Sequence, residues 1–423
     1  MRFQEQSTTI VCHLALRLPE IVNHILSYLT VPYHYDETNK TKIYQYIHPC
    51  LLVNSLWHDC ATRLIWRAVT FEDSKSEYEA FLKFAGVISN SHINHSDTTS
   101  SAAGLAIAAP KMTGLFGDHK FLKLQKLSQL QKDIKQEQRL QLQQFYTEHD
   151  LIEDPAFLQY SHSNSTRPQH TISHHSQYAN AIRSIALRKI KDKTINEPLQ
   201  QISRHSQKLE KLDIYICDHL ADSSVHNFIT NNHHSLTYLS LAGCNRITDD
   251  AVLSVAKNCP KLEHLDLRAC GLISDISIQA IAMNCPDLHH LNVGRVRDRE
   301  KITMQSIRLV AENTKVAVLG LAGCDMTDEC LIALAKCRGR GLERISVNNC
   351  YRITNKSVQA YVKYCPNLSV FEMKECHWID DWSSVAELVQ RKVLLTLCDQ
   401  QNRACTEWAR QRGRVMEVKA PVK

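Results

Sequence analysis

The sequence predicts an α/β solenoid, a horseshoe of stacked repeats, preceded by a small all-helical domain. Three observations lead to this prediction. An apolar pattern recurs about every 26 residues through the second half of the chain, and the cysteines there recur with the same period. The length of 423 residues also exceeds what one compact core usually holds, so a second structural region is expected.

The repeating unit begins with an apolar pattern of the form L-x-x-L-x-L. Eight such segments start at residues 182, 209, 236, 262, 288, 316, 342 and 368, in steps of 26 to 28 residues. A truncated last strand is expected at Leu394. A period of roughly 20–29 residues with this signature is typical of leucine-rich repeats. We therefore predict about eight repeats over residues 181–398.

One repeat shows the physical basis of the pattern. In the unit that begins at Leu262, Leu265 and Leu267 alternate with polar residues, as in a short strand with one buried side. A helical stripe of apolar residues follows, with Ser274 positioned as the helix N-cap. Pro286 ends the helix and favours extended backbone before the next strand. Each repeat is therefore expected to be one short strand followed by one helix.

The sixteen cysteines indicate packing rather than a disulfide or metal framework. No two have the C-x-x-C spacing of common zinc and redox sites. They recur at apolar positions, once at the strand end and once at the helix end of a repeat, where cysteine serves as a small buried hydrophobe. A catalytic thiol or a metal ligand is the alternative, which stacking disfavours because it keeps equivalent cysteines in neighbouring turns. We expect no metal and no cofactor.

Composition and charge exclude several classes of protein. With 43% hydrophobic and 22% charged residues the chain is expected to be soluble and folded, and no apolar stretch approaches the ~20 residues that cross a bilayer. The first residues lack the apolar run of a secretory signal, so we expect an intracellular protein without membrane insertion.

The net charge of +6 comes mostly from the C-terminal region. Residues 391–423 carry eight Lys or Arg against three Asp or Glu, so the rest of the chain is close to neutral. A nucleic-acid reader more often carries its basic residues on a folded face with interleaved aromatics, so no nucleic-acid partner is expected. Residues 399–423 are predicted to be a solvated basic tail, with an import signal or a site for an acidic partner as the alternative.

The segment before the repeats is predicted to be a polar linker over residues 74–180. Ser, Thr, Asn and His dominate residues 90–101 and 161–176. Residues 125–144 hold eight Gln among Lys and Leu, and the a/d spacing is not sustained, which favours a short solvated helix over a coiled coil. The histidines of the second polar stretch lack apolar surroundings to fix them, so a metal site there is not expected.

The repeat motif resembles that of a known class of protein. The pattern L-x-x-L-x-L-x-x-C, then I-T/S-D, then a helix ending in N-C-P is similar to the cysteine-containing leucine-rich repeats of F-box proteins. Upstream, residues 18–29 resemble the opening helix of an F-box and residues 51–67 its closing half. Residues 30–50 form an insertion that a compact F-box lacks. The resemblance implies an F-box-like helical domain over residues 1–73.

An interrupted F-box, a long polar linker and repeats of this type together most resemble the fungal antagonists of the mitotic exit network. The resemblance covers residues 18–73 and 182–397. It implies a cell-cycle regulator, present in cytoplasm and nucleus, that opposes an exit pathway driven by a small GTPase. It also implies that the chain can attach to a cullin ubiquitin ligase through a ligase adaptor.

The helical domain carries the first set of candidate binding residues. Its apolar residues are too many for a free surface, and so short a domain buries them poorly by itself. Pro19 fits the first position of a helix, where a missing N–H costs nothing. The residues expected to contact a ligase adaptor are Leu18, Pro19, Ile21, Ile25, Leu26 and Trp57.

The repeats carry the other two sets. Alternation along the strands turns polar side chains outward on the concave face, which are Tyr238, His264, Asp266, Arg268, His290, Asn292, Arg344, Asn348, Glu372 and Lys374. These residues are mixed in charge, which favours a folded protein partner over an acidic polymer, and many are expected to be ordinary solvated positions. The repeat after Val293 has a longer loop, and its residues Arg295, Arg297 and Arg299 are expected on a binding rim.

The sequence offers no catalytic constellation, so we expect a binding protein rather than an enzyme. A Gly-rich phosphate loop, G-x-S-x-G and H-E-x-x-H are all absent from it. Two functions remain open. An adaptor would hold a ligase through the F-box and a target through the repeats, whereas a stoichiometric inhibitor would exclude an effector from a small GTPase. A generic F-box receptor with an unrelated target and a thiol-dependent enzyme are the alternatives, and a monomer is expected outside complexes.

Overall fold

The computed structural model describes four segments of the chain, which are residues 14–29, 46–72, 75–89 and 174–421. The Gln-rich segment at residues 125–144 and most of the predicted linker lie outside these segments. The described residues form two separate hydrophobic cores. The first lies among the N-terminal helices, and the second is shared by the repeats.

The N-terminal helical domain consists of η1 (Leu14–Arg17), α1 (Pro19–Leu29), η3 (His48–Leu52) and α3 (Ser55–Arg67). Its buried residues are Val22, Leu26, Ile47, Cys50, Cys60 and Ala61. Asn54 begins α3, because its Oδ1 accepts a hydrogen bond from the backbone N–H of Trp57 at 3.0 Å. Ile47 and Cys50 fall within the predicted insertion, so the end of that insertion belongs to the core.

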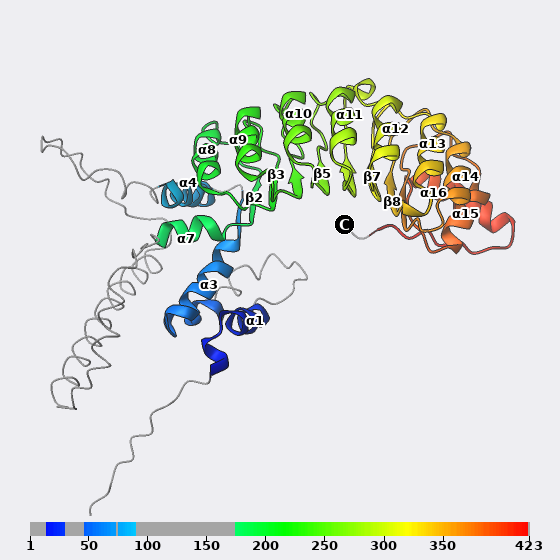
Figure 1. Ribbon diagram of the computed structural model, residues 1–423. Coiled ribbons are helices and arrows are strands. Elements are labelled where there is room, and N and C mark those ends of the chain that lie inside the picture. Colours follow the sequence, from blue (N-terminus) through cyan, green and yellow to red (C-terminus); the bar gives the residue numbers. More distant parts are fainter. Residues whose placement is uncertain (1–13, 30–45, 73–74, 90–173, 422–423) are drawn as a thin grey trace, which may run out of the picture. The chain divides into compact units, whose positions relative to one another are not determined.

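Ten parallel strands pair in sequence order to form one sheet (Figure 1). They are β1 (Ala68–Phe71), β2 (Ser184–Arg188), β3 (Lys211–Tyr215), β4 (Tyr238–Ser240), β5 (His264–Asp266), β6 (His290–Asn292), β7 (Val318–Gly320), β8 (Arg344–Ser346), β9 (Val370–Glu372) and β10 (Leu394–Thr396). The strands are in register, so Leu239 of β4 lies beside Leu265 of β5, which lies beside Leu291 of β6.

One helix follows each strand. These helices are α4 (Lys75–Ser89), α8 (Asn196–His205), α9 (Asp222–Asn232), α10 (Asp249–Asn258), α11 (Asp275–Asn284), α12 (Met304–Asn313), α13 (Asp328–Arg338), α14 (Asn355–Tyr364), α15 (Trp382–Gln390) and α16 (Asp399–Gln411). The remaining elements of the repeats are α7 (His174–Ala181), η5 (Arg299–Lys301) and η6 (Gly339–Gly341). Helices α8 to α14 lie along the outer side of the sheet, and the strands line its inner side (Figure 1).

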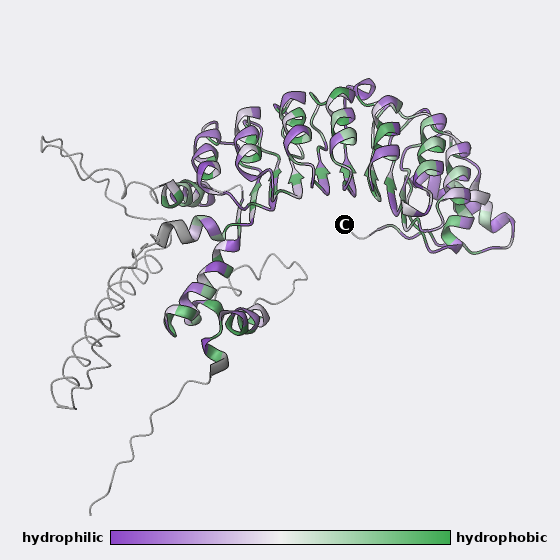
Figure 2. Ribbon diagram, viewed as in Figure 1, coloured by the Kyte–Doolittle hydropathy of each residue, from purple (hydrophilic) through white to green (hydrophobic). Residues whose placement is uncertain are grey.

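The alternation of apolar and polar residues along the strands places the apolar side chains in the repeat core. Leu239, Leu265 and Leu291 are fully buried, and so are Val255 and Ile281 on the helices behind them. Figure 2 shows hydrophobic colour on the strands of the repeats and hydrophilic colour on much of the outer helical surface. Each repeat therefore buries its apolar side against its neighbours. The predicted α/β solenoid of leucine-rich repeats after a helical domain is confirmed.

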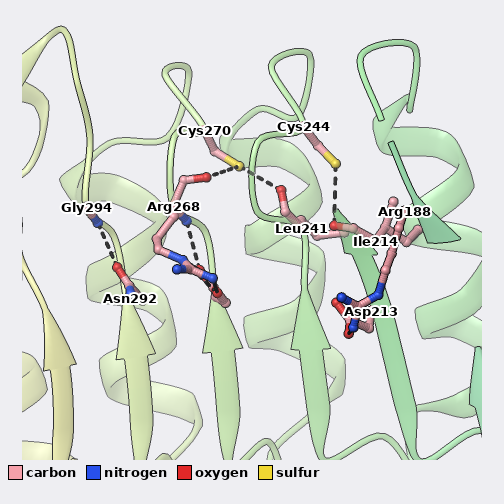
Figure 3. Close-up of polar contacts among 10 residues, drawn as sticks. Arg188, Asp213, Ile214, Leu241, Cys244, Arg268, Cys270, Asn292 and Gly294 are labelled. Atoms are coloured by element: carbon pink, nitrogen blue, oxygen red, sulfur yellow. Dashed lines mark hydrogen bonds and ion pairs between the residues drawn. The ribbon is translucent and has the colours of Figure 1, made fainter. Parts of the chain in front are cut away.

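The strand-end cysteines link neighbouring repeats (Figure 3). The Cys270 thiol donates a hydrogen bond to the carbonyl of Leu241 at 3.1 Å, which Figure 3 shows. The Cys376 thiol donates to the carbonyl of Val347 at 3.1 Å in the same way. Burial raises the pKa of the Cys270 thiol to about 12, so this group stays protonated and unreactive. The prediction that the recurring cysteines pack inside the repeats is confirmed, apart from the exposed Cys337 and the half-buried Cys398.

Aspartates at helix N-termini form a second link between repeats. Asp249 accepts hydrogen bonds from the backbone N–H of Ser274 at 2.9 Å and from its hydroxyl at 2.6 Å. Asp275 accepts the same two bonds from Thr303, at 2.9 and 2.6 Å. Ser274 is also the predicted N-cap, because its Oγ accepts from the N–H of Ile276 at 3.3 Å. Each aspartate thus fastens its own helix to the cap of the next one.

The repeat body begins earlier than predicted. β1 pairs in parallel with β2, and the backbone N–H of Arg183 donates to the carbonyl of Arg67 at 2.8 Å. Phe81 and Ile88 of α4 are buried in the repeat core. The prediction of a linker over residues 75–89 is therefore wrong. This first unit carries the pattern only as Trp66-x-x-Val69-x-Phe71, without leucine or a strand-end cysteine, and a long segment separates it from the next strand, so the repeat period does not reveal it.

The predicted basic tail begins with ordered structure. Helix α16 buries Cys405 in the repeat core, and Ala409 on the same helix is also buried. Beyond α16, the carbonyl of Lys419 accepts a hydrogen bond from the backbone N–H of Leu395 in β10 at 2.8 Å. The prediction of a solvated tail is wrong for residues 399–411, because small apolar side chains on one side of this charged helix pack onto the core.

None of the helices in the described segments is long and apolar enough to cross a membrane. Within the same segments, no three or more His, Cys, Asp or Glu side chains are grouped closely enough to hold a metal ion.

Candidate protein-binding surfaces

An aromatic column runs across the concave face, which we define as the side chains that point away from the core on β2 to β9 and on the two residues after each strand. The Tyr238 ring lies parallel to the His264 ring with centroids 3.9 Å apart, and His264 stacks on His290 at the same distance. The Lys211 ammonium lies 4.0 Å from the Tyr238 ring centroid. In-register pairing of β3 to β6 brings these residues side by side, so three predicted concave residues form one column.

Burial determines the charge state of this column. Burial lowers the pKa of His264 to about 3, and the positive charge of His290 would act in the same direction. Burial also lowers the pKa of His290, although the nearby Asp266 carboxylate opposes this effect. The pKa of Tyr238 is raised to about 12 by burial. At neutral pH the column therefore consists of uncharged rings beside the Lys211 ammonium.

Arginine–carboxylate pairs accompany the column (Figure 3). Arg188 Nη2 lies 3.5 Å from Asp213 Oδ2, and Arg268 Nη2 lies 2.7 Å from Asp266 Oδ2. Arg268 Nε donates to both carboxylate oxygens of Asp266, at 3.0 and 2.9 Å. Asp266 is buried by this pairing, so of these two predicted residues only Arg268 is directly accessible to a partner. The prediction of Asp266 as a contact residue is wrong for this reason.

A polar network lies towards the C-terminal end of the concave face. Arg344 pairs with Glu372 across β8 and β9. Asn348 Nδ2 donates to Glu372 Oε2 at 3.2 Å, while Asn348 Oδ1 accepts from the backbone N–H of Lys374 at 2.7 Å. Lys374 Nζ lies 3.8 Å from Glu375 Oε1. The structure thus brings four of the predicted concave residues together.

Small residues line the middle of the concave face. Asn292 Oδ1 accepts a hydrogen bond from the N–H of Gly294 at 3.1 Å (Figure 3). The Asn292 amide lies over Gly320, where a Cβ atom would come within 2.3 Å of it. Gly320 therefore allows Asn292 to lie flat, and few side chains project from β6 and β7.

Arg295 departs most from the sequence prediction. It is buried, and its guanidinium donates to the carbonyls of Asp298 at 2.8 Å and Ile273 at 3.0 Å. Its positive charge favours a lower pKa for the thiols of Cys270 and Cys324, in the repeats on either side, but burial raises both pKa values by more. Arg295 therefore packs inside the repeats, next to a strand-end position that holds Val296 instead of cysteine. Its prediction as a partner-binding residue is wrong.

The rest of the rim loop contacts a later repeat through Arg299. Arg299 Nη1 donates to the carbonyl of Asn349 at 2.6 Å, and Nη2 donates to the Tyr351 hydroxyl at 2.8 Å. The Arg299 guanidinium also lies 3.9 Å from the Tyr351 ring centroid. Arg299 thus joins the loop to the second repeat after its own. Val296 and Arg297 remain exposed, so Arg297 is the loop arginine most accessible to a partner.

Exposed apolar residues of the same rim escaped the sequence analysis. They are Leu272, Tyr351 and Trp378. Each follows a strand-end cysteine by one or two residues. Backbone bridges place Leu272 beside Thr248 and Trp378 beside Thr354, at the helix N-caps. The available signal was a large apolar residue at a loop position outside the buried pattern.

The helical domain exposes part of the predicted adaptor contact. The exposed predicted residues are Leu18, Pro19 and Ile21 of the start of α1 and the turn before it. Ile25 and Trp57 are half-buried. Leu26 is fully buried in the helical core, so its prediction as a direct contact is wrong. The sequence analysis missed Leu52 and Val53 at the end of η3, which are also exposed.

These observations define a leucine-rich-repeat protein with an N-terminal helical domain. Comparison with known families agrees, because residues 232–256 and 258–282 match the leucine-rich repeat family. A chain in the crystal structure of the Rad7 and Elc1 complex in yeast is similar over 54% of this chain and 65% of that chain, with 15% identity and a TM-score of 0.41.

Several curated relatives carry the name antagonist of mitotic exit network protein 1. The relative from Yarrowia lipolytica is 43% identical over 151 residues, which are 36% of this chain and 21% of the relative. The relative from Eremothecium gossypii is 33% identical over 250 residues, 50% of this chain and 55% of the relative. The relative from Saccharomyces cerevisiae is 33% identical over 179 residues, 41% and 27% of the two chains. The resemblance to the antagonists of the mitotic exit network is confirmed.

The matches span between about a fifth and about half of the length of these three relatives. What the whole relatives do is therefore a matter of proposal for this chain.

Proposed function

We propose that this chain is a negative regulator of mitotic exit that acts by binding other proteins through its repeats. The similarity to proteins named as antagonists of the mitotic exit network supports the pathway. The repeat fold supports binding as the mode of action, because a stacked solenoid presents an extended surface to a partner. The proposed role is non-catalytic and is exercised in cytoplasm and nucleus.

The observation that carries this proposal is the concave face itself. Tyr238, Arg268 and Lys374 come from separate repeats, and the in-register sheet presents them on one surface. Aromatic rings and arginines of this kind dominate the energetics of protein interfaces. This arrangement supports binding along an extended surface.

Blockade is the first mechanism that we propose. The repeats hold a small GTPase of the exit pathway and keep its effector away. This mechanism needs neither the helical domain nor ubiquitin. The chain is monomeric before it binds.

Ligase attachment is the second mechanism that we propose. Leu18, Ile21, Leu52 and Val53 are exposed around a small core, and apolar residues of this kind mark a partner site. A cullin ligase adaptor is the partner that the F-box-like arrangement of α1 and α3 supports. A target held by the repeats would then be ubiquitinated.

The pathway assignment is tested in fungal cells whose own relative has been deleted. We expect expression of this chain to lengthen the interval between spindle elongation and spindle disassembly, measured by time-lapse microscopy. Substitution of Tyr238 and Arg268 by Ala should shorten that interval again, because it removes contacts of the concave face. An interval that is the same with and without the chain would show that the pathway is wrong.

A paired substitution separates the two mechanisms. Leu18→Ala with Ile21→Ala should abolish co-purification of the ligase and lengthen the half-life of the target. The control is Leu272→Ala, because Leu272 is 47% exposed and Leu18 is 45% exposed, but Leu272 lies on the repeats. If target abundance stays fixed while exit is still delayed, ligase attachment is wrong and blockade remains. If mass spectrometry of bound proteins finds a target but no small GTPase, the chain is a ligase receptor for an unrelated protein.

A further inference from the structure

We propose that the concave face recognises an acidic, extended segment of a partner protein, and that Arg188, Arg268 and Arg344 determine this preference. The proposal rests on the protein-binding function proposed above and specifies the chemistry of the partner. Its basis is the depth at which the charged groups lie.

The three arginine–carboxylate pairs share one asymmetry. The arginine side chains of the pairs are between 39% and 55% exposed, whereas their carboxylate partners are only between 7% and 15% exposed. The partners are Asp213, Asp266 and Glu372. Each pair is neutral as a whole, but its positive end is turned towards the partner. The outer layer of the concave face is therefore basic, although its sequence is mixed in charge.

The buried carboxylates prepare the arginines for a second acid. A guanidinium carries five N–H donors, and Arg268 uses Nε and Nη2 for Asp266. Its other donors remain for an external carboxylate, and the existing bonds already hold the side chain in place. Because less side-chain freedom is lost on binding, such an arginine suits an acidic ligand.

The pairs lie along one line across the sheet. Asp213, Asp266 and Glu372 occupy the same register position on β3, β5 and β9. Neighbouring strands lie about 4.8 Å apart, so the pairs are separated by about 10 Å and about 19 Å. An extended chain advances about 3.3 Å per residue, so acidic residues about three and about six positions apart match them. Between the second and third pairs, Asn292, Gly320 and Ser346 leave room for a backbone.

The groups around this line favour a protein over a nucleic acid. Lys211 and Lys374 add positive charge at the two ends, and Glu375 beside Lys374 is the acid that partly offsets it. The rings of Tyr238 and His264 stack on each other, so their faces are already covered. Bases of a single strand need free aromatic faces to stack on. Carboxylates need only the guanidinium donors that the arginines present.

The test selects ligands from a displayed library of random peptides. Peptides of about 12 residues are long enough to span the three pairs when extended. The full chain is the bait, and a single-stranded oligonucleotide of matched charge is offered as a competitor. We expect the enriched peptides to be acidic, with carboxylates about three and about six residues apart, and their binding to weaken as salt is raised.

Three variants make the test specific. Arg188→Gln, Arg268→Gln and Arg344→Gln combined should weaken the selected peptides at least about tenfold, as expected for lost charge-assisted hydrogen bonds. Arg268→Gln with Asp266→Asn should also weaken them, without leaving a buried carboxylate unpaired. The control changes the same charge on helices α8, α12 and α16 through Arg204→Gln, Arg308→Gln and Arg410→Gln, which are exposed, and binding should persist.

Several outcomes would overturn the proposal. They are enrichment of neutral or basic peptides, equal binding by the first variant and the control, no enrichment above background, and full displacement by the oligonucleotide. None of them bears on the mitotic timing assay, so a failure here is distinguishable from a failure of the proposed pathway role.

Discussion

The helical domain and the repeats bury their apolar side chains to different extents. The helical domain has a small core around Val22 and Leu26, and it leaves Leu18 and Leu52 exposed. The repeats share one core from β1 to α16, in which each buried leucine contacts equivalents in neighbouring repeats. Stability in the repeats therefore comes from neighbours within the chain. The helical domain keeps apolar surface that a neighbour from outside can cover.

Deleting one buried leucine from each region should have the largest effect. Leu265→Ala and Leu26→Ala each remove a fully buried side chain, which costs about 2–5 kcal/mol of unfolding free energy. Leu265→Ala should reduce amide protection in adjacent repeats, whereas Leu26→Ala should reduce it only in the helical domain. Hydrogen exchange followed by mass spectrometry measures both. Loss of protection in both regions from either variant would contradict the division into two cores.

Alanine substitutions at two glycines should have opposite effects on stability. One glycine lies in a turn between repeats, and the other lies in the first helix of the repeat body. Gly323 has a φ of +71°, and an added Cβ would lie 2.0 Å from the carbonyl oxygen of Arg295. Gly323→Ala should lower the Tm and cost more than the roughly 1–2 kcal/mol of left-handed strain alone. Gly86 in α4 has no atom within 4 Å of an added Cβ, so Gly86→Ala should stabilise by about 0.5–1 kcal/mol. A lower Tm for Gly86→Ala would show that α4 packs differently.

Acid should weaken the repeats through Asp328, which accepts hydrogen bonds from the next repeat. Burial would raise the pKa of Asp328, but hydrogen bonds from Ser357 and Thr354 outweigh it and hold the pKa below its usual value. The stability from such a group is present above its unfolded-state pKa of about 3.9 and is lost as pH falls through the lower folded-state pKa. Asp328→Asn should therefore flatten the decline in repeat stability below about pH 4, measured by urea unfolding. Asp250→Asn, at an exposed position, is the control, and an identical slope in the two variants would remove Asp328 from the account.

Reagents that attack thiols or metals should have the smallest effect. Burial raises the pKa of the Cys259 and Cys285 thiols to about 12, so almost no thiolate exists there at neutral pH. Iodoacetamide should label the exposed Cys337 long before these two, as peptide mapping can show. Zinc chelators and reductants should leave the Tm unchanged. A large fall in Tm under either treatment would mean that the cysteines do more than pack.

Periodicity made most of the fold predictable. Leu265 and its equivalents recur at a spacing that only a stacked repeat satisfies, and the Ser274 cap marks the helix start. β1 and α4 could not be found in this way, because a first repeat packs on one neighbour only and need not keep the period. The rim loop was located by its length, but the burial of Arg295 depends on hydrogen bonds to the carbonyls of Asp298 and Ile273, which the local sequence does not reveal.

The sequence predicted which residues lie on the binding surface, but not how deeply each side chain is buried. Alternation placed Asp266 and Arg268 on the same outward side of the strand. It could not show that the carboxylate lies beneath the guanidinium, since depth depends on where a long side chain folds back. A sequence of mixed charge can therefore present charge of one sign.

The backbone bond between Leu395 and Lys419 has a practical consequence for handling the protein. The last strand of an open sheet offers free N–H and C=O groups to any extended chain, including a second copy. Because the segment around Lys419 occupies part of that strand, this route to self-association is partly closed. A purification tag fused after this segment would disturb its pairing with β10. A tag at the N-terminus should therefore give a protein that self-associates less.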